Sequence, residues 1–428
     1  MIELYKLSNQ IKHYAWGSPN FIPHLLCTAS DGQPWAELWM GCHPGAPSQV
    51  ILPSEPAGGL ISLGELIAAD PFRYLGKETA QKYAALPFLF KLLAAEKPLS
   101  IQAHPNLTQA QEGFSRENSA GLPVDAPNRN YKDPNHKPEI ICALTPFTGM
   151  CGFRSPDVIK ELLTQFVSQR HSGTELTEGI SSLMRVLETP RESHSSTEAQ
   201  REEGQLQEFL SSLFAMPRGI REALTEYILT IPVNEDTSLE YRLMQEFARL
   251  YPGDPAVISP LYLNVFNLEP GEAIFLQAGV LHAYCSGFGV ELMANSDNVL
   301  RGGLTGKHID IPELMHVLDF TPMTPQIIKP VPGTVPNMES GSCFTYPAPC
   351  DEFSLTRINS TGVTVPWRTE GPAIGIVTEG EVNAGGMILK QGESVFIPPG
   401  EKLLLQGNFT LYAASIGSAA SCGSTASV

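Results

Sequence analysis

The pattern of hydrophobic and polar positions changes twice along the chain. Up to about residue 153, short apolar runs such as PFLFKLLAAE (87–96) alternate with Gly, Pro and polar turn formers. Runs of this length bounded by turn formers are typical of strands, so this region is predicted to be mostly β. We expect one helical segment near Glu78–Ala85 and a long polar loop from Gly113 to Pro138, a length of loop that is usually functional or mobile.

A helical pattern begins at Ser155, which is followed by a proline, as at the start of many helices. Apolar side chains then recur at the spacing of one helical face. Three such stripes are Ile159, Leu162, Leu163, Phe166 and Val167; Leu206, Phe209, Leu210, Leu213 and Phe214; and Leu239, Leu243, Phe247 and Leu250. Residues 155–252 are therefore predicted to be a helical insertion, with a polar, disordered loop near Arg191–Gly204.

Two segments after the helical region repeat one pattern. Residues 271–282 read GEAIFLQAGVLH and residues 392–403 read GESVFIPPGEKL, with Gly-Glu, an aromatic-aliphatic pair and a second Gly at the same offsets. Two similar hairpins indicate a duplicated β-barrel unit. The element resembles the hairpin of cupins, which are small double-sheet jelly rolls. The first copy ends in His282 and the second has Leu403 there, so a metal site using this histidine would exist only in the first unit.

These patterns predict a mainly β fold with a helical insertion: two cupin-like jelly-roll β-barrel domains plus an α-helical domain. Residues 1–154 and 253–325 would form the catalytic cupin-like domain, and residues 155–252 the helical insertion. Residues 326–416 would form a C-terminal cupin-like domain without a metal site, followed by a disordered tail, 417–428.

Composition narrows the functional classes. The net charge of −17 and the lack of a Lys/Arg block argue against nucleic acid as a partner. No apolar run is long enough to cross a bilayer, the first residues do not resemble a secretory signal, and the eight cysteines include no C-x-x-C pair. We therefore expect a cytoplasmic protein with no membrane partner, and a monomer. A small anionic substrate remains compatible with this charge if basic side chains converge in one pocket.

Four side chains are candidates for one metal site. Gln102 and His104 are two residues apart on a predicted strand and so leave the same face, while Ile101 and Ala103 lie on the other. Glu139 begins a predicted strand after a proline, and His282 follows the Gly turn of the first hairpin. Together they offer the mixed oxygen and nitrogen ligands that zinc accepts. Taken singly, each histidine is more often a hydrogen-bonded core residue than a ligand, and Gln is a rare ligand.

A family resemblance joins these observations. The chain contains, in order, YAWG (14–17), PWAELWMG (34–41), KPLSIQAHP (97–105), HKPE (136–139), GVLHAY (279–284) and NSDNVLRGGLT (295–305). These motifs resemble the diagnostic blocks of type I mannose-6-phosphate isomerases, and the similarity extends in the family's order from residue 14 to about 325. It implies one zinc ion per chain, held by Gln102, His104, Glu139 and His282, and the interconversion of mannose 6-phosphate and fructose 6-phosphate. The proton would move between C1 and C2 through a cis-enediol.

The resemblance also implies a catalytic role for Arg301, near the sugar carbonyl or the phosphate. Without the surrounding block, an ordinary surface ion pair between Arg301 and Asp297 would be the simpler interpretation. The two glycines after Arg301 would let the backbone turn tightly beside a ligand. The base is open among Lys137, Glu291, Asp297 and His136. We favour Lys137 and then Asp297, against the alternative that Lys137 is a solvated loop cation.

Further residues in or near the matched blocks are expected to contact the substrate. They are Ser100, Lys97, His136, Tyr284, Glu291 and Lys307. Phosphate needs convergent cations or backbone donors, and the sequence does not decide which of them touch it. The run GGLTGKH (302–308) is not a nucleotide loop, because its glycines are one residue too close and His308 replaces Ser or Thr. A metal-dependent cupin oxygenase and a non-catalytic sugar-binding cupin remain the alternatives.

Overall fold

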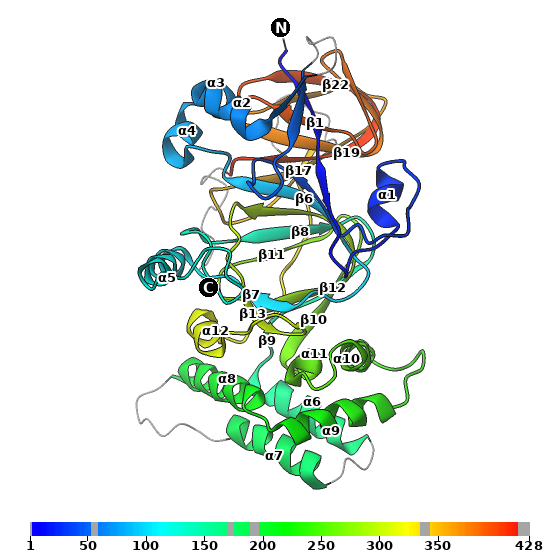
Figure 1. The fold of residues 1–428 in the computed structure, drawn as a ribbon. Coiled ribbons are helices and arrows are strands. Elements are labelled where there is room, and N and C mark those ends of the chain that lie inside the picture. Colours follow the sequence, from blue (N-terminus) through cyan, green and yellow to red (C-terminus); the bar gives the residue numbers. More distant parts are fainter. Residues whose placement is uncertain (1, 53–58, 170–173, 189–196, 334–342, 418–428) are drawn as a thin grey trace.

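A computed structural model describes residues 2–52, 59–169, 174–188, 197–333 and 343–417. Its elements are stacked in three tiers (Figure 1): a sheet containing the C-terminal strands, a second sheet in the middle, and a group of helices at the far end. In the described part of the chain, no helix combines the length and the apolar character needed to span a membrane. The seven described cysteines are free thiols.

The middle tier is an eleven-stranded antiparallel sheet that positions most of the candidate site. Its main path runs β14 (Ile327–Ile328), β11 (Ala273–Leu276), β8 (Glu139–Ala143), β12 (His282–Ala294), β6 (Phe88–Ala95), β3 (Glu37–Met40) and β2 (Gln10–Lys12). Four further strands complete it: β7 (Ile101–Ala103), β9 (Phe147–Phe153), β10 (Leu263–Leu268) and β13 (Leu300–Gly303). The long strand β12 pairs with β6, β7, β8 and β9 and so connects the two halves of this tier.

The other eleven-stranded sheet is also antiparallel and combines both ends of the chain. Its main path is β15 (Val331–Pro332), β16 (Cys343–Tyr346), β17 (Ser354–Thr361), β22 (Lys402–Ser415), β19 (Ala373–Ala384), β21 (Ser394–Ile397), β1 (Tyr5–Ser8), β4 (Gln49–Leu52) and β5 (Gly59–Ser62), with β18 (Val365–Arg368) and β20 (Met387–Lys390) beside it. Tyr5 is in register with Phe396, so the first strand of the chain lies against the second copy of the repeated hairpin.

The two repeated segments fold alike. In each, a four-residue strand (β11 and β21) is followed by a turn and then by the start of a long strand (β12 and β22). The paired glycines share one left-handed backbone conformation: φ is 88° at Gly271 and 83° at Gly392, and 80° at Gly279 and 84° at Gly400. Only glycine adopts this conformation without strain, which explains why these positions are identical in the two copies.

The helical tier begins where the sequence predicts. Helix α6 (Pro156–Ser168) follows Ser155, and the other two predicted stripes form α8 (Glu198–Phe214) and α10 (Leu239–Leu250). Two helices that the sequence analysis did not identify, α7 (Thr174–Glu188) and α9 (Arg218–Thr230), pack between them. The helices elsewhere are α1 (Phe21–Leu25), α2 (Leu63–Ala69), α3 (Pro71–Leu75), α4 (Lys77–Tyr83), α5 (Leu107–Ser119), α11 (Ser259–Tyr262) and α12 (Ile311–Val317), with a 3-10 turn at Pro255–Ile258.

Two predicted loops are wrong in part because local capping extends helices into them. The loop predicted over Arg191–Gly204 ends at Thr197, whose side chain accepts a hydrogen bond from Gln200 N in a capping box that starts α8. Residues 191–196 lie outside the described residues. The loop predicted from Gly113 likewise begins inside α5, which has its own capping box at Asn106. Of the predicted tail, 417–428, residues 418–428 lie outside the described residues as well.

The helical tier and the middle sheet share one hydrophobic core. Ile101 and Ala103 of β7 are fully buried in the same cluster as Ile159, Phe209 and Phe247 of the helices. Each fully buried aliphatic side chain contributes roughly 1.5–3 kcal/mol to folding. Burial of one face of β7 therefore fixes the direction of the opposite face, which carries Gln102.

Candidate metal and substrate site

Three buried side chains converge at the end of the middle sheet. Ligand atoms of His104, Glu139 and His282 all lie within 4.8 Å of one another. The distance from His104 Nε2 to Glu139 Oε2 is 3.4 Å, and from His282 Nε2 to Glu139 Oε1 it is 3.1 Å. The side-chain amide of Gln102 joins them, with Nε2 3.5 Å from His282 Nε2. Strand pairing explains this convergence, because His282 is in register with Gln102 across β12 and β7.

Both histidines are oriented by backbone oxygens. Nδ1 of His104 lies 2.7 Å from the carbonyl oxygen of Asn298, and Nδ1 of His282 lies 2.9 Å from that of Val280. These contacts favour the tautomer with a proton on Nδ1, which leaves both Nε2 atoms as free electron-pair donors toward Glu139. The histidines are thus prepared as ligands rather than as hydrogen-bond donors.

The charges at this cluster suit a cation. Burial of Glu139 opposes its ionisation, but the charge of Lys137 and the two neighbouring histidines hold the pKa of Glu139 well below its usual value. Burial, together with the charge of Lys137, lowers the pKa of His104 to about 4. At neutral pH the set is therefore one carboxylate and at least one neutral imidazole, as zinc requires.

The spacing of these atoms fits zinc. Tetrahedral bonds of about 2.0–2.1 Å place ligand atoms roughly 3.3 Å apart, close to the separations found here. Glu139 Oε2 is buried and accepts no hydrogen bond of good geometry, so it has a free lone pair for a metal. A half-turn of the Gln102 amide exchanges its nitrogen and oxygen and brings a fourth ligand atom to the site.

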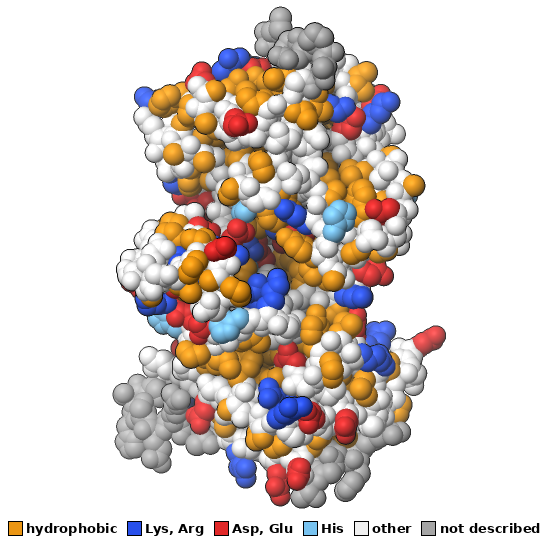
Figure 2. All heavy atoms as spheres, in the orientation of Figure 1, with side chains coloured by type: hydrophobic (Ala, Val, Ile, Leu, Met, Phe, Trp, Pro, Cys, Tyr) orange, Lys and Arg blue, Asp and Glu red, His pale blue; other side chains and the backbone are white. Residues whose placement is uncertain are grey.

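A pocket of about 440 Å³ adjoins the cluster. Five basic side chains, three carboxylates and several aromatic rings line it, so it carries a local excess of positive charge on a protein of net charge −17. Figure 2 shows a hollow in the middle of the face, near the position of β7 and β13 in Figure 1, with basic side chains at its edge. The basic residues of the pocket are Lys91, Lys132, Lys137, Arg301 and Lys307.

Arg301 faces this pocket as a half-buried cation. Among the residues that the structure describes, it makes no side-chain hydrogen bond or ion pair, and burial lowers its pKa. The alternative of an ion pair between Arg301 and Asp297 is wrong, because Asp297 Oδ2 lies 3.2 Å from His43 Nε2 instead. Both side chains line the pocket, so the guanidinium remains available to an anionic substrate.

Lys137 is not the solvated loop cation that the sequence left as an alternative. Its side chain is buried, and Nζ lies 3.2 Å from Glu139 Oε2 and 3.3 Å from His104 Nε2. Pro138 and strand β8 hold Lys137 next to the metal ligands. Tyr284 is equally close to them, since its hydroxyl donates to Glu139 Oε1 at 3.2 Å. Tyr284 therefore also orients a ligand.

A buried charge cluster forms one wall and was missed in the sequence. Lys91 Nζ lies 2.9 Å from Glu291 Oε2 and 3.7 Å from Glu37 Oε1, and it also lies over the ring of Trp39. Burial raises the pKa of Glu291, while the two carboxylates keep Lys91 charged despite its own burial. A lysine in the middle of the apolar run PFLFKLLAAE is the signal that could have indicated this cluster, since strand β6 is buried throughout.

Two expected substrate contacts are not brought to the pocket. His136 Nε2 lies 2.9 Å from Glu352 Oε1, on the loop before β17, and is thus held away. Lys97 is exposed in the turn after β6. Ser100, Tyr284, Glu291 and Lys307 do line the pocket.

The second glycine after Arg301 is required by close packing. A Cβ at Gly303 would lie 2.2 Å from Cβ of Ala256, and φ there is 130°, outside the range that other residues favour. The next residue, Leu304, donates its backbone N–H to Asp254 Oδ2 at 2.7 Å. The turn also lies beside the pocket, because Arg301 before the glycines and Leu304 after them line it, so the expectation of a tight turn beside a ligand stays a prediction.

Comparison with known proteins agrees with this site. A model of the phosphomannose isomerase type I catalytic domain matches residues 4–156. The mannose-6-phosphate isomerase of Escherichia coli K12 is 38% identical over 405 residues, which cover 93% of this chain and 95% of that protein. This chain belongs to the type I phosphomannose isomerase family. The human mannose-6-phosphate isomerase is 31% identical over 426 residues, covering 94% of this chain and 95% of its own length.

Solved structures of the family have the same fold. A zinc-bound crystal structure of mannose 6-phosphate isomerase superimposes with a TM-score of 0.83 at 35% identity, covering 97% of this chain and 100% of the other. A variant of the phosphomannose isomerase from Salmonella typhimurium gives the same values. This family member thus shares its architecture with a zinc-containing isomerase and holds a buried His-Glu-His cluster.

Proposed function

We propose that this chain is a zinc-dependent isomerase that interconverts mannose 6-phosphate and fructose 6-phosphate, with one zinc ion held by Gln102, His104, Glu139 and His282. The observation that carries the proposal is the buried ligand cluster at one end of a basic pocket. A zinc ion supplies a fixed positive charge that stabilises developing charge on the C1 and C2 oxygens of the sugar.

The proton transfer between C1 and C2 proceeds through a cis-enediol, with Lys137 as the base and Asp297 as the second candidate. Lys137 Nζ lies 3.2–3.3 Å from two metal ligands, so a sugar carbon close to the metal is within its reach. Arg301 contacts the carbonyl oxygen or the phosphate, which is supported by its lack of a side-chain partner among the described residues.

The phosphate is bound by Lys307 together with Ser100 and Lys132, which line the same pocket. Burial and the nearby charges of Arg301 and Lys132 lower the pKa of Lys307, which indicates that these cations lie close together. A phosphate dianion placed among them offsets their mutual repulsion. The alternatives fit less well, since an oxygenase typically has a ligand set richer in histidine and needs no arginine beside the metal.

The fold has two cupin-like jelly-roll domains and a helical insertion, with the boundaries predicted above except near the start of the chain, where β1, β4 and β5 belong to the sheet of the C-terminal unit. The duplicated hairpin supports this division, and Leu403 in place of His282 accounts for a single metal site. The protein acts as a monomer in the cytoplasm, where free thiols persist.

The test is conversion of mannose 6-phosphate to fructose 6-phosphate by the purified protein, before and after treatment with a chelator. Activity should disappear with the metal and return on addition of zinc, without oxygen consumption. Full activity of protein shown to contain no metal would overturn the zinc assignment, and no turnover of the zinc-loaded protein would overturn the proposed reaction. Oxygen uptake would favour the oxygenase.

A further inference from the structure

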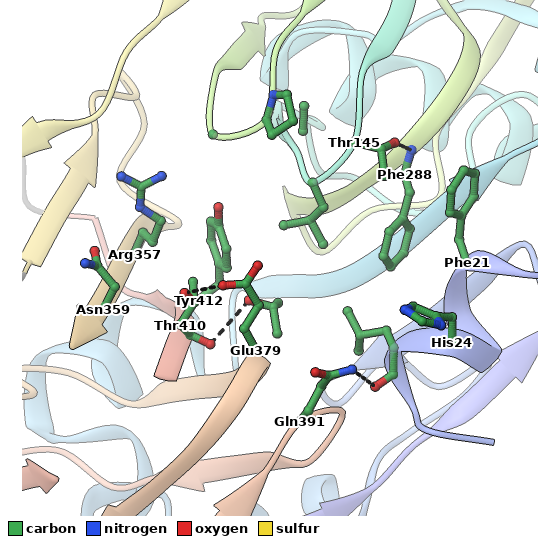
Figure 3. Close-up of a pocket in the computed structure, with 16 residues that line it drawn as sticks. Phe21, His24, Thr145, Phe288, Arg357, Asn359, Glu379, Gln391, Thr410 and Tyr412 are labelled. Atoms are coloured by element: carbon green, nitrogen blue, oxygen red, sulfur yellow. Dashed lines mark hydrogen bonds between the residues drawn. The ribbon is translucent and has the colours of Figure 1, made fainter. Parts of the chain in front are cut away.

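A larger cavity lies away from the metal cluster. It has a volume of about 730 Å³ and shares no lining residue with the metal and substrate pocket. Strands β17, β19 and β22 of one sheet form one side, and helix α1, the β8–β9 turn and strand β12 form the other. Figure 3 shows Arg357 and Asn359 on one side of this cavity and Phe288 and Phe21 on the opposite side. Nothing described above assigns a role to it.

Arg357 gives the cavity an unpaired cation. Within the described ranges of the chain, its guanidinium makes no ion pair or hydrogen bond, and its Nε is buried without a partner. The guanidinium lies 4.9 Å from the ring centroid of Phe344, and Nη1 packs so closely on Gly271 that a Cβ there would be 2.7 Å away. The side chain is thus held in place by stacking and packing, and its charge is left free for a ligand.

Polar acceptors accompany this cation. Asn359 Oδ1 is buried with no hydrogen-bond partner, so it is available to a donor. Glu379 is exposed and accepts a hydrogen bond from Thr410 Oγ1 at 2.9 Å, and it is not paired with Arg357. One guanidinium and one carboxylate therefore face the same cavity separately, and Figure 3 shows Glu379 between Arg357 and the aromatic side.

The opposite side of the cavity is mainly apolar, with Thr145 and His24 beside the rings of Phe288 and Phe21 (Figure 3). The rings of Phe21 and Phe288 are stacked with centroids 5.5 Å apart and an angle of 2° between their planes. Leu25 and Leu144 extend this wall. A flat apolar group bound here would be removed from water against an already ordered surface, which favours affinity.

We propose that this cavity binds a small carboxylate that carries a hydroxyl or ammonium donor next to the carboxylate and a flat apolar group. The carboxylate pairs with Arg357, the donor group meets Glu379 or Asn359, and the apolar group lies on Phe288. A polyphosphate fits less well, because the cavity has only one guanidinium to neutralise it. The nearby carboxylate and the net charge of −17 would both repel a polyanion. This inference is independent of the proposed isomerase activity.

The experiment is calorimetric titration of the zinc-loaded protein with three probes that share a phenyl ring and a carboxylate. L-Phenylalanine carries an ammonium group, L-3-phenyllactate carries a hydroxyl in its place, and 3-phenylpropionate has neither. We expect saturable binding at millimolar concentration or below of at least one of the first two, and binding of 3-phenylpropionate at least about tenfold weaker. Equal binding of all three, or saturable binding of none, overturns the proposal.

Variants distinguish this cavity from other binding sites. Arg357→Met should weaken binding of the probe about tenfold or more, because a charge-assisted pair is lost. Arg357→Lys should retain part of the affinity, and Arg368→Met, on strand β18 of the same sheet, should leave it unchanged. Isomerase activity and the melting temperature of each variant show whether it is folded. Undiminished binding by a folded Arg357→Met variant overturns the assignment.

Glu379→Gln tells the two donor classes apart. It should weaken binding of L-phenylalanine more than binding of L-3-phenyllactate if the carboxylate of Glu379 contacts an ammonium group. An equal small effect on the binding of both probes assigns the natural ligand to the hydroxy acids. A gain in affinity for both probes would show that Glu379 repels the ligand and would overturn its role as acceptor.

Discussion

The carbonyl oxygen of Asn298 lies 2.7 Å from Nδ1 of His104. The side chain of the same asparagine holds the loop that leads to Glu139, another of the proposed metal ligands. Its Oδ1 accepts from Lys132 N at 2.7 Å, and its Nδ2 donates to Asp133 O at 2.7 Å and to Asn135 O at 2.9 Å. One fully buried residue therefore fixes both the ring of His104 and the chain segment preceding Glu139.

Asn298→Ala should destabilise the protein and loosen the metal site. Loss of three buried hydrogen bonds is expected to lower the free energy of unfolding by about 3 kcal/mol, and loss of this support should weaken zinc binding by about 10- to 100-fold. Denaturant unfolding and competition with a zinc chelator measure the two effects. The control is Asn408→Ala, which substitutes an exposed asparagine. Unchanged zinc affinity in a folded Asn298→Ala variant would refute the link to His104.

His282→Ala should abolish stoichiometric zinc binding and isomerase activity together. The residue supplies one of the four ligand atoms, and Glu139 Oε1 loses its neighbour at 3.1 Å. Metal analysis after gel filtration and the isomerase assay check this. His316→Ala, at an exposed histidine of α12, should keep one zinc per chain and full activity. One tightly bound zinc in folded His282→Ala would remove this residue from the ligand set.

Arg301→Ala should reduce turnover much more than zinc content. The guanidinium faces the pocket and has no described protein partner, so its loss leaves the metal ligands in place. A fall in kcat/KM of about 10²–10³-fold is expected for one charged donor in such a site. Arg301→Lys should recover part of it, because the charge remains but the planar fork is lost. Turnover equal to that of the unsubstituted protein would contradict the catalytic assignment.

The metal-free protein should lose stability as the pH falls from 7 to 5. The pKa of His104 is lowered from 6.5 to about 4 in the folded state. At pH values between these two, the histidine binds a proton in the unfolded chain but not in the folded chain. Unfolding is therefore favoured by acid, by about 2 kcal/mol from pH 7 to pH 5 for this group. Urea unfolding of chelator-treated protein at several pH values measures it. His104→Gln should show a shallower dependence, and an equal slope in both proteins would exclude this residue as the cause.

The sequence could predict the elements whose patterns are local. The stripes of α6, α8 and α10, the apolar strand β6 and the repeated hairpins all follow from spacing and glycine positions. It could also predict the convergence of Gln102 and His282, because strand phase and the repeat restrict where they point. Helix boundaries were less predictable: the capping box at Thr197 starts α8 inside a segment whose polar composition indicates a loop, and α5, which starts at the capping box of Asn106, extends into the loop predicted from Gly113.

The pairing of polar side chains that are far apart in the sequence could not be predicted. The pairing of Asp297 with His43 joins residues separated by most of the chain, and the cluster of Lys91 with Glu37 and Glu291 depends on the register of β3, β6 and β12. The single lysine in the apolar run of β6 can signal a buried charge, but it does not identify the two carboxylates that enclose Lys91, and a single lysine in an apolar strand also occurs at exposed edges. The direction of His136 toward Glu352 likewise depends on packing between the two sheets.

The base can be identified by separating chemistry from metal binding. Lys137 contacts Glu139 and His104, whereas Asp297 is held by His43 at the edge of the pocket, and the interaction with His43 keeps the pKa of Asp297 below its usual value despite partial burial. We expect Lys137→Met in its zinc-loaded form to lower kcat by about 10²–10⁴-fold, because general-base catalysis contributes about that much. Asp297→Asn, the matched variant, should lower it less. Exchange of the C2 proton of mannose 6-phosphate with deuterated solvent, followed by NMR, reports the transfer step directly. Loss of exchange in Asp297→Asn together with retained exchange in zinc-loaded Lys137→Met would transfer the role to Asp297.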